Sequence, residues 1–415
     1  GDRQELKDDA AVLVAAWREA DVIGPMIAHT LRVWPQRRMT LYVGCYRNDP
    51  VTLAAAIAAA AGDPRLRIVV HDCKGPTTKA DCLNRLHAAM CDDEARRGRA
   101  YATVVLHDAE DMVHPAALTV LDTALIGADF VQLPVRPEPQ ALSPWIAGHY
   151  GDEFAEAHAK TMVVRDALGA GLPAAGVGCG FSRAMLARIA ALRAENGGSH
   201  DEAGPFAADC LTEDYELGLL VARSGGRSRF LRMIGPDRAL IATRAFFPGR
   251  LEEAARQKAR WIHGISLQGW DRLGWAGRPV DIWMSLRDRR GPLTAIVLSA
   301  AYCMVLIEVM LVAADLAGWK RQVVPSPELE VMLTLCVAAF AWRAAWRFGF
   351  TAREYGLEEG VRSFLRMPVA NVIAILAGRR ALLAYWGGLR GDRVTWDKTH
   401  HHRHPAALDA GRLLA

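Results

Sequence analysis

The sequence predicts an α/β domain with a mostly parallel, Rossmann-like sheet, followed by an α-helical membrane region. In the first part of the chain, short apolar runs alternate with segments of helical periodicity, which is typical of a sheet covered by helices on both faces. In the last third, apolar runs are long enough to cross a bilayer. The composition agrees, because 51% of the 415 residues are hydrophobic although 23% are charged.

Four short apolar runs are expected to form the first strands. Residues 11–16 (AVLVAA) contain no polar side chain, as is typical of a parallel strand buried on both faces. Similar runs follow at 39–44, 66–70 and 102–106. Helices are expected between these runs, over 22–31, 51–61 and 80–91. The alternation favours right-handed crossovers and parallel pairing.

Acidic side chains follow these strands. Glu19 comes after the first strand, Asp49 after the second, and Asp108 and Glu110 after the fourth. Ligands of parallel sheets bind beyond the carboxyl ends of the strands. We therefore expect these side chains to converge at one edge of the sheet.

The middle of the chain is rich in glycine. We expect residues 151–181 to be irregular, and Gly-x-Gly-x-x-Gly does not occur within 176–181 (GVGCGF). A nicotinamide-binding fold is therefore not predicted. Two helices are expected beyond this region, over 214–222 and 250–267, the second from its apolar periodicity.

Three apolar segments are candidates for membrane crossing: 293–314, 329–346 and 368–386. We expect the first two to cross. The third contains Arg379 and Arg380, which lipid tolerates poorly, and is expected to lie in or re-enter the interface.

The flanks of these segments indicate their orientation. Residues 358–367 have the pattern of an amphipathic interfacial helix. Arg287, Arg289 and Arg290 precede the first segment and favour a cytoplasmic location for that end. We expect three parts: a catalytic domain over 1–285, membrane and interfacial helices over 286–390, and a tail over 391–415.

Charge and cysteine usage exclude some classes of function. A formal net charge of +4 gives no case for binding nucleic acid. The eight cysteines form no Cys-x-x-Cys pair, which favours reduced thiols over a disulfide framework or a zinc site.

Five short motifs occur in a fixed order. They are Trp17-Arg18-Glu19, Lys79–Asn84, His107–Asp111, Leu211–Asp214 and Gln257–Trp261. In this order the chain resembles the inverting nucleotide-sugar glycosyltransferases of family 2, which have the GT-A fold and include the cellulose, hyaluronan and chitin synthases. Within the family it resembles the inner-membrane glycosyltransferases of the bacteriophage adsorption protein B type. The segments that carry this second resemblance are 16–23, 46–50, 75–84, 107–111 and 396–399.

Asp108 and Glu110 are the expected metal ligands. Two carboxylates, together with the oxygens of a diphosphate, suit Mg²⁺ or Mn²⁺. The family has Asp-x-Asp here, so Glu110 is a departure that keeps the charge. The alternatives are a solvated acidic turn, or a hydrolytic metal site that includes His107 and His114.

The resemblance assigns the role of general base to Asp214, with Glu213 beside it. The base must be ionised and close to the acceptor hydroxyl group. The alternative is that both acids occupy the first turn of a helix because the helix dipole favours them there.

Donor binding is expected from residues in several motifs. Gln257, Arg260 and Trp261 share one face of a helix, where arginine suits a diphosphate and tryptophan a sugar ring, although a core tryptophan with solvated neighbours gives the same pattern. The resemblance adds Trp17, Glu19, Lys79 and Asp108. Asp49 is the best substitute for a family Asp pair that is missing after the second strand.

Two further segments are assigned by resemblance. Gly178, Gly180 and Phe181 correspond to an acceptor-side loop that acts together with Trp261. Lys398, Thr399 and His401 belong to Trp-x-Lys-Thr-x-His, which resembles a gating loop that closes over the nucleotide. A glycine-rich turn and a basic tail are the alternatives.

The resemblance implies an inverting hexosyl- or N-acetylhexosaminyl-transferase in the bacterial inner membrane, with a cytoplasmic catalytic domain. It would use a nucleotide-diphosphate sugar, with UDP as the expected nucleotide, to extend an envelope polysaccharide. The expected partners are a glycan or lipid-linked acceptor, membrane lipids and an outer-membrane export protein. Single addition to a lipid-linked acceptor, or a non-catalytic envelope or phage-receptor scaffold, are the alternatives.

Overall fold

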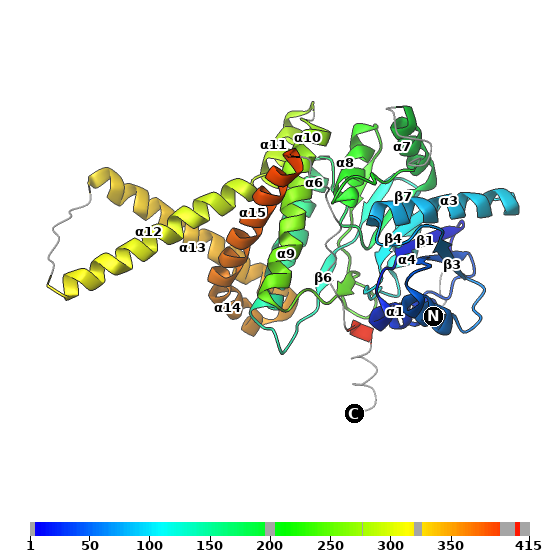
Figure 1. Ribbon diagram of the computed structural model, residues 1–415, viewed down its shortest axis with the longest axis horizontal. Coiled ribbons are helices and arrows are strands. Elements are labelled where there is room, and N and C mark those ends of the chain that lie inside the picture. The colour runs from blue at the N-terminus through cyan, green and yellow to red at the C-terminus, as the bar shows by residue number, and fades with distance from the viewer. Residues whose placement is uncertain (1–4, 196–203, 276, 319–325, 391–402, 407–415) are drawn as a thin grey trace.

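A seven-stranded mixed sheet forms the centre of the N-terminal domain (Figure 1). The computed structural model describes residues 5–195, 204–275, 277–318, 326–390 and 403–406. The strand order is β3-β2-β1-β4-β7-β5-β8, and β7 is antiparallel to both of its neighbours. The strands are β1 (Ala10–Ala15), β2 (Met39–Tyr46), β3 (Leu66–His71), β4 (Thr103–Asp108), β5 (Phe130–Gln132), β7 (Cys179–Ser182) and β8 (Ser228–Phe230). The four predicted strands and the mostly parallel sheet are confirmed.

Strand β1 shows how the sheet divides the core into two layers. Val12 and Val14 pack with α1 (Ala20–Val33), α2 (Pro50–Ala60) and α4 (Ala117–Leu125) on one face. Ala11 and Leu13 pack on the other face, with α3 (Lys79–Arg97), α7 (Arg183–Glu195) and α8 (Glu213–Arg223). Because successive side chains of a strand point to opposite faces, an apolar run without alternation is what a doubly covered strand requires.

Residues 151–181 differ from the prediction of an irregular segment. They contain the end of α5 (Ile146–Glu156), a π-helical turn (Ala157–Thr161) and α6 (Met162–Ala167) before the chain becomes irregular. The buried residues Ala147, Tyr150, Ala155 and Met162 recur at helical spacing. The glycines that suggested irregularity lie mainly after this helical part, from Gly169 onwards.

The C-terminal part of the chain is helical. Helix α9 (Leu251–Trp261) continues through a π-helical turn (Ile262–Gln268) into α10 (Gly269–Leu273). The remaining helices are α11 (Pro279–Asp288), α12 (Gly291–Leu316), α13 (Pro327–Tyr355), α14 (Leu357–Leu365) and α15 (Met367–Leu389). A small second sheet pairs β6 (Val135–Pro137) with β9 (Thr243–Ala245) beside the main one.

Three of these helices, α12, α13 and α15, are long and apolar enough to cross a membrane. They differ in their surroundings. Helices α12 and α13 project together away from the domain, whereas α15 lies alongside α9 and packs against it (Figure 1). Accordingly, 33% of the most apolar window of α15 is buried, against 6% in α12 and 0% in α13.

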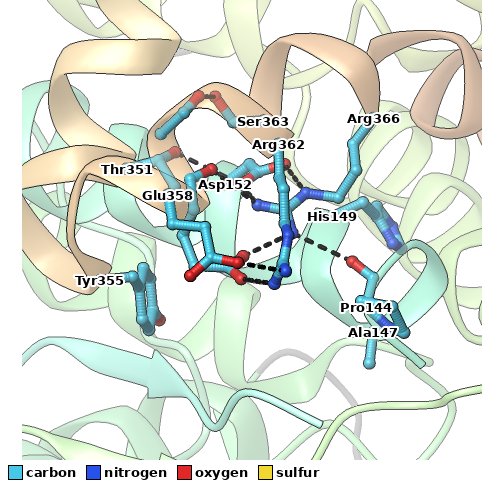
Figure 2. A network of polar contacts seen from close by, with 12 residues as sticks. Pro144, Ala147, His149, Asp152, Thr351, Tyr355, Glu358, Arg362, Ser363 and Arg366 are labelled. Carbon is cyan, nitrogen blue, oxygen red and sulfur yellow. Dashed lines mark hydrogen bonds and ion pairs between the residues drawn. The ribbon is translucent and has the colours of Figure 1, made fainter. Parts of the chain in front are cut away.

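A buried ion pair links the C-terminal helices to helix α5 of the N-terminal domain (Figure 2). Arg366, between α14 and α15, donates hydrogen bonds of 2.7 and 2.8 Å to the two carboxylate oxygens of Asp152 on α5. Its third nitrogen donates to Glu359 and to the carbonyl oxygen of Pro144. A Cβ atom at position 148 would lie 2.5 Å from this guanidinium group, so Gly148 is required for the close approach.

Candidate active site

A cavity of about 810 Å³ opens at the carboxyl ends of β1 and β4. Five chain segments bring polar side chains to its wall. These side chains are Trp17, Glu19, Lys79, Asp108, Glu110, Glu213, Asp214, Gln257, Arg260 and Trp261. The parallel pairing of Ala15 with Asp108 places the turn after β1 beside the turn after β4.

Lys79 is the basic residue at the centre of this acidic wall. Thr78 caps helix α3 by accepting a hydrogen bond from the Asp81 backbone, so the helix begins at Lys79. The Lys79 ammonium nitrogen lies 2.5 Å from a carboxylate oxygen of Asp108. The charges of Glu213 and Asp214 also act on it, and together these three acids raise the pKa of Lys79 although burial opposes the rise. Lys79 is therefore cationic at neutral pH.

Glu213 and Asp214 occupy the first turn of α8, and both reach the cavity. The helix-dipole explanation and a role in the cavity are therefore compatible. Burial raises the pKa of Asp214 and raises that of Glu213 to about 7, while Lys79 opposes both changes. A Cβ atom on Gly176, which has φ +73°, would lie 2.6 Å from the Asp214 carboxylate. Glycine at 176 is thus what permits this loop to approach Asp214.

Gln257, Arg260 and Trp261 reach the cavity from one face of α9. The indole of Trp261 packs edge-on against Tyr150 and Phe247, with ring centroids 6.1 and 6.5 Å apart. Such contacts fix the orientation of the ring. Trp261 is therefore both a core residue and part of the cavity wall.

The turn after β1 is held by Asp49, which is not among the described residues that line the cavity. The Asp49 carboxylate accepts a hydrogen bond of 2.6 Å from the backbone of Arg18, a non-glycine residue with φ +54°. The backbone of Glu19 donates to Thr52 at 2.9 Å. Trp17 and Glu19 thus reach the cavity from a turn that Asp49 stabilises.

The glycine-rich segment is placed differently from what the resemblance implies. Phe181 is buried in the core and stacks on Phe130, with ring centroids 4.7 Å apart. Gly180 packs on Leu121 and Leu125. Gly178, with φ +59°, faces Thr243. Among the described residues, none of these three lines the cavity, whereas the neighbouring Val177 does.

One part of the cavity wall was not predicted from the sequence. Helix α5 and the π-helical turn contribute Glu153, Phe154 and His158 to it. Both oxygens of Glu153 accept hydrogen bonds of 2.6 Å from Lys258, which overcomes the effect of burial and lowers the pKa of Glu153 to about 2. Glu153 and Lys258 lie far apart in the sequence and on different helices, so no local pattern links them. The role of this carboxylate is visible only in the folded structure.

Lys398, Thr399 and His401 lie outside the described residues. The short described segment that follows returns to the N-terminal domain. There the His404 ring is buried, and its Nε2 lies 3.0 Å from the carbonyl oxygen of Asp111. The His404 segment is thus fixed beside the loop that carries Asp108 and Glu110.

The two predicted metal ligands fit a hard divalent cation. Asp108 and Glu110 both reach the cavity, and Mg²⁺ is commonly bound by one or two carboxylates together with substrate phosphates. Among the described residues, no group of three or more His, Cys, Asp or Glu side chains could hold a metal. His107 is buried and pairs with Asp111 at 2.8 Å, which does not favour the hydrolytic alternative.

Comparisons with known proteins found one matching family and two similar proteins. Residues 8–264 match the family described as glycosyltransferase like family 2. The chain is 33% identical over 413 residues to bacteriophage adsorption protein B of Escherichia coli (strain K12). It is equally similar to bacteriophage N4 adsorption protein B of Escherichia coli O157:H7. The match covers 94% of this chain and 54% of each relative, so the chain spans about half their length.

Two solved structures are similar in fold. A mannosyltransferase from Pyrobaculum calidifontis in complex with GDP-Man and Mn²⁺ has a TM-score of 0.48 and 16% identity, over 88% of this chain and 91% of its own. Glucosyl-3-phosphoglycerate synthase from Mycobacterium tuberculosis in complex with Mg²⁺ and uridine-diphosphate has a TM-score of 0.36 and 17% identity. That match covers 62% of this chain and 78% of the synthase.

Proposed function

This chain belongs to glycosyltransferase family 2, and on that premise we propose that it is a membrane-bound inverting glycosyltransferase. Its donor is a nucleotide-diphosphate sugar, with UDP as the nucleotide, and its product is an envelope polysaccharide. One observation carries the proposal. Lys79, Asp108, Asp214 and Trp261, which lie far apart in the sequence, line a single cavity at the carboxyl end of the sheet.

Asp214 is proposed to be the general base. Its carboxylate takes the proton of the acceptor hydroxyl group as that oxygen attacks the anomeric carbon of the donor sugar. The bond from this carbon to the diphosphate oxygen breaks at the same time, and the configuration inverts. Burial raises the pKa of Asp214, which makes its carboxylate a stronger base than a solvent-exposed one.

The departing diphosphate needs positive charge. Lys79 and Arg260 supply it from two separate segments of the cavity wall, and arginine can hold a phosphate with two parallel hydrogen bonds. Asp108 and Glu110 would hold Mg²⁺ or Mn²⁺, which would supply Lewis acidity to the diphosphate. Trp17 and Glu19 are proposed to contact the nucleoside, and Gln257 the donor.

The part of the cavity beside Trp261 and Phe154 is proposed to hold the acceptor glycan. Trp261 offers a flat ring for a pyranose, and Glu153 offers a carboxylate that stays ionised and can accept hydrogen bonds from sugar hydroxyl groups. Phe154 and His158 extend the same wall. A cavity of about 810 Å³ suits an acceptor of more than one sugar unit beside the donor.

We propose that the protein resides in the bacterial inner membrane, with the catalytic domain in the cytoplasm, where nucleotide sugars are made. The apolar surfaces of α12 and α13 support contact with lipid, since Met310 and Leu335 are 71% and 64% exposed. An export protein of the outer membrane would be a partner for the finished polysaccharide.

A donor screen tests the proposal. Membranes that contain the protein are incubated with a panel of UDP- and GDP-sugars, and the released nucleoside diphosphate is measured. One donor should give release, and Asp214→Asn should lower turnover at least about 100-fold while donor binding is kept. Absence of release with every donor would favour the scaffold alternative, and near-normal turnover of the variant would remove Asp214 from the role of base.

A further inference from the structure

Four arginines gather where α12 and α13 leave the domain. Arg287 and Arg290 lie just before α12, and Arg343 and Arg347 lie in the second half of α13, which packs on α5. The charges of Arg287 and Arg343 both act on Arg290. The charges of Arg343 and Arg347 both act on Glu156 at the end of α5. These four residues are called the arginine cluster below.

The carboxylates that face the arginine cluster already have other partners. Glu156 accepts a 2.8 Å hydrogen bond from Lys160, and its distance to Arg347 is 3.9 Å. Asp288 accepts two hydrogen bonds of 2.9 Å from Arg165 and one from Tyr215. The cluster therefore carries an excess of positive charge.

The cluster is only partly buried, because Arg290 and Arg343 are exposed and Arg287 is half-buried. Arg347 is only 6% exposed, and within the described part of the chain its Nε has no hydrogen-bond partner. The side chains of Arg287, Arg290 and Arg343 make no hydrogen bond or ion pair with any described residue. Arg347 thus combines burial with an unused donor, and the exposed guanidinium groups beside it present N–H donors that no described residue occupies, so the cluster can accept an anion.

The surroundings indicate which anion fits the cluster. Trp342 and Trp346, on the same helix, pack edge to face with ring centroids 5.4 Å apart, and the Lys160 ammonium lies 5.7 Å from the Trp346 ring. Tryptophan and basic residues together are typical of the level of the lipid headgroups. No arginine of the cluster is among the described residues lining the cavity, so the diphosphate of the donor is not the ligand.

We propose that the arginine cluster binds the phosphate of an anionic phospholipid whose acyl chains lie against α12 and α13. Guanidinium groups are suited to phosphate because their N–H donors are fixed in one plane. Basic pockets between membrane helices on the cytoplasmic side are known sites for such headgroups. The site holds a structural lipid, and its occupation is independent of glycosyl transfer.

Native mass spectrometry of the purified full chain tests the proposal. The probes are phosphatidylglycerol and phosphatidylcholine with the same acyl chains. The chain should retain phosphatidylglycerol preferentially, and Arg343→Gln/Arg347→Gln should weaken its retention about 25-fold, since each basic residue near a membrane surface contributes roughly a 5-fold change. Arg353→Gln is the matched control, because Arg353 is an exposed arginine on the same helix, and it should change retention less than about 2-fold.

Three outcomes would overturn the assignment. The first is equal retention of the two lipids by the unaltered chain, a result that needs no variant to fold. The second is unchanged retention in the double variant. The third is complete displacement of the lipid by millimolar inorganic phosphate, which would indicate a site for a soluble anion. Arg343→Lys/Arg347→Lys keeps the charge, so it should fold and retain more lipid than the Gln variant.

Discussion

The ammonium group of Lys79 pairs with Asp108 at 2.5 Å and also opposes the rise in the pKa values of Glu213 and Asp214. Replacing Lys79 with methionine keeps the volume but removes the charge. The pKa of Asp214 should then rise further, so the base would be protonated up to a higher pH. We expect the acidic limb of the pH–rate profile to move to higher pH in Lys79→Met and to stay in place in Lys79→Arg. An unmoved limb in Lys79→Met would show that Lys79 does not tune the base.

Removal of divalent cations should stop sugar transfer. Asp108 and Glu110 provide only carboxylate oxygens, so excess chelator should abolish release of nucleoside diphosphate, and Mg²⁺ or Mn²⁺ should restore it. Glu110→Gln should require a higher metal concentration for half-maximal activity. Full activity in excess chelator would exclude the metal-assisted mechanism.

Glu213 should destabilise the folded protein at alkaline pH. Its pKa is raised from 4.5 to about 7, so the folded state binds its proton more tightly than the unfolded state between these values. The free energy of unfolding therefore falls as the pH rises through this window, by ~3 kcal/mol when the shift is fully expressed. Glu213→Gln should raise the thermal midpoint at pH 8 by more than at pH 5. A difference that is independent of pH would contradict this assignment.

The Asp152–Arg366 pair should be a major contributor to docking of the membrane helices. Asp152→Asn leaves a buried guanidinium without its main partner, which typically costs ~3–5 kcal/mol of folding free energy. Glu358→Gln is the control, because Glu358 forms an exposed ion pair with Arg362, worth less than ~1 kcal/mol. Thermal unfolding in detergent measures both, and equal midpoints for the two variants would contradict the importance of the buried pair.

The sequence predicted the elements whose local pattern is long enough to be recognised. Strand β1 was identifiable because its apolar run is unbroken, whereas the three-residue strands β5, β6 and β8 are too short to show a period. The end of helix α5 was not predicted, because the glycines that follow it indicated an irregular segment although its apolar residues recur at helical spacing. Composition alone predicted that α12 and α13 are long apolar helices that could cross a membrane.

For the candidate site, motif order correctly predicted which segments approach one another, because the carboxyl ends of parallel strands share one edge. It did not predict how single side chains are used. Asp49 supports a turn through the Arg18 backbone, and Phe181 fills the core beside Phe130. Glu153 depends on Lys258 from another helix. Such roles depend on contacts between distant segments, which neither composition nor spacing contains.

The structure also bears on how the chain crosses the membrane. The Asp108 loop must face the compartment that holds the nucleotide sugar, and His404 contacts the carbonyl oxygen of Asp111 at 3.0 Å. The His404 segment therefore lies in that same compartment. An even number of crossings is required between Trp261 and His404, although three helices are long and apolar enough to cross.

We predict that α12 and α13 cross and that α15 does not, since α15 packs on α9 of the catalytic domain and contains Arg379 and Arg380. Cysteine labelling of intact cells from outside checks this. A membrane-impermeant maleimide should react at Ser326→Cys, in the segment that joins α12 and α13 and is predicted to lie outside, and should not react at Arg403→Cys. Both positions are exposed, so both should react after permeabilisation, which controls for access. Reaction at Arg403→Cys in intact cells would make α15 a true crossing, and would place the His404 segment away from the Asp108 loop.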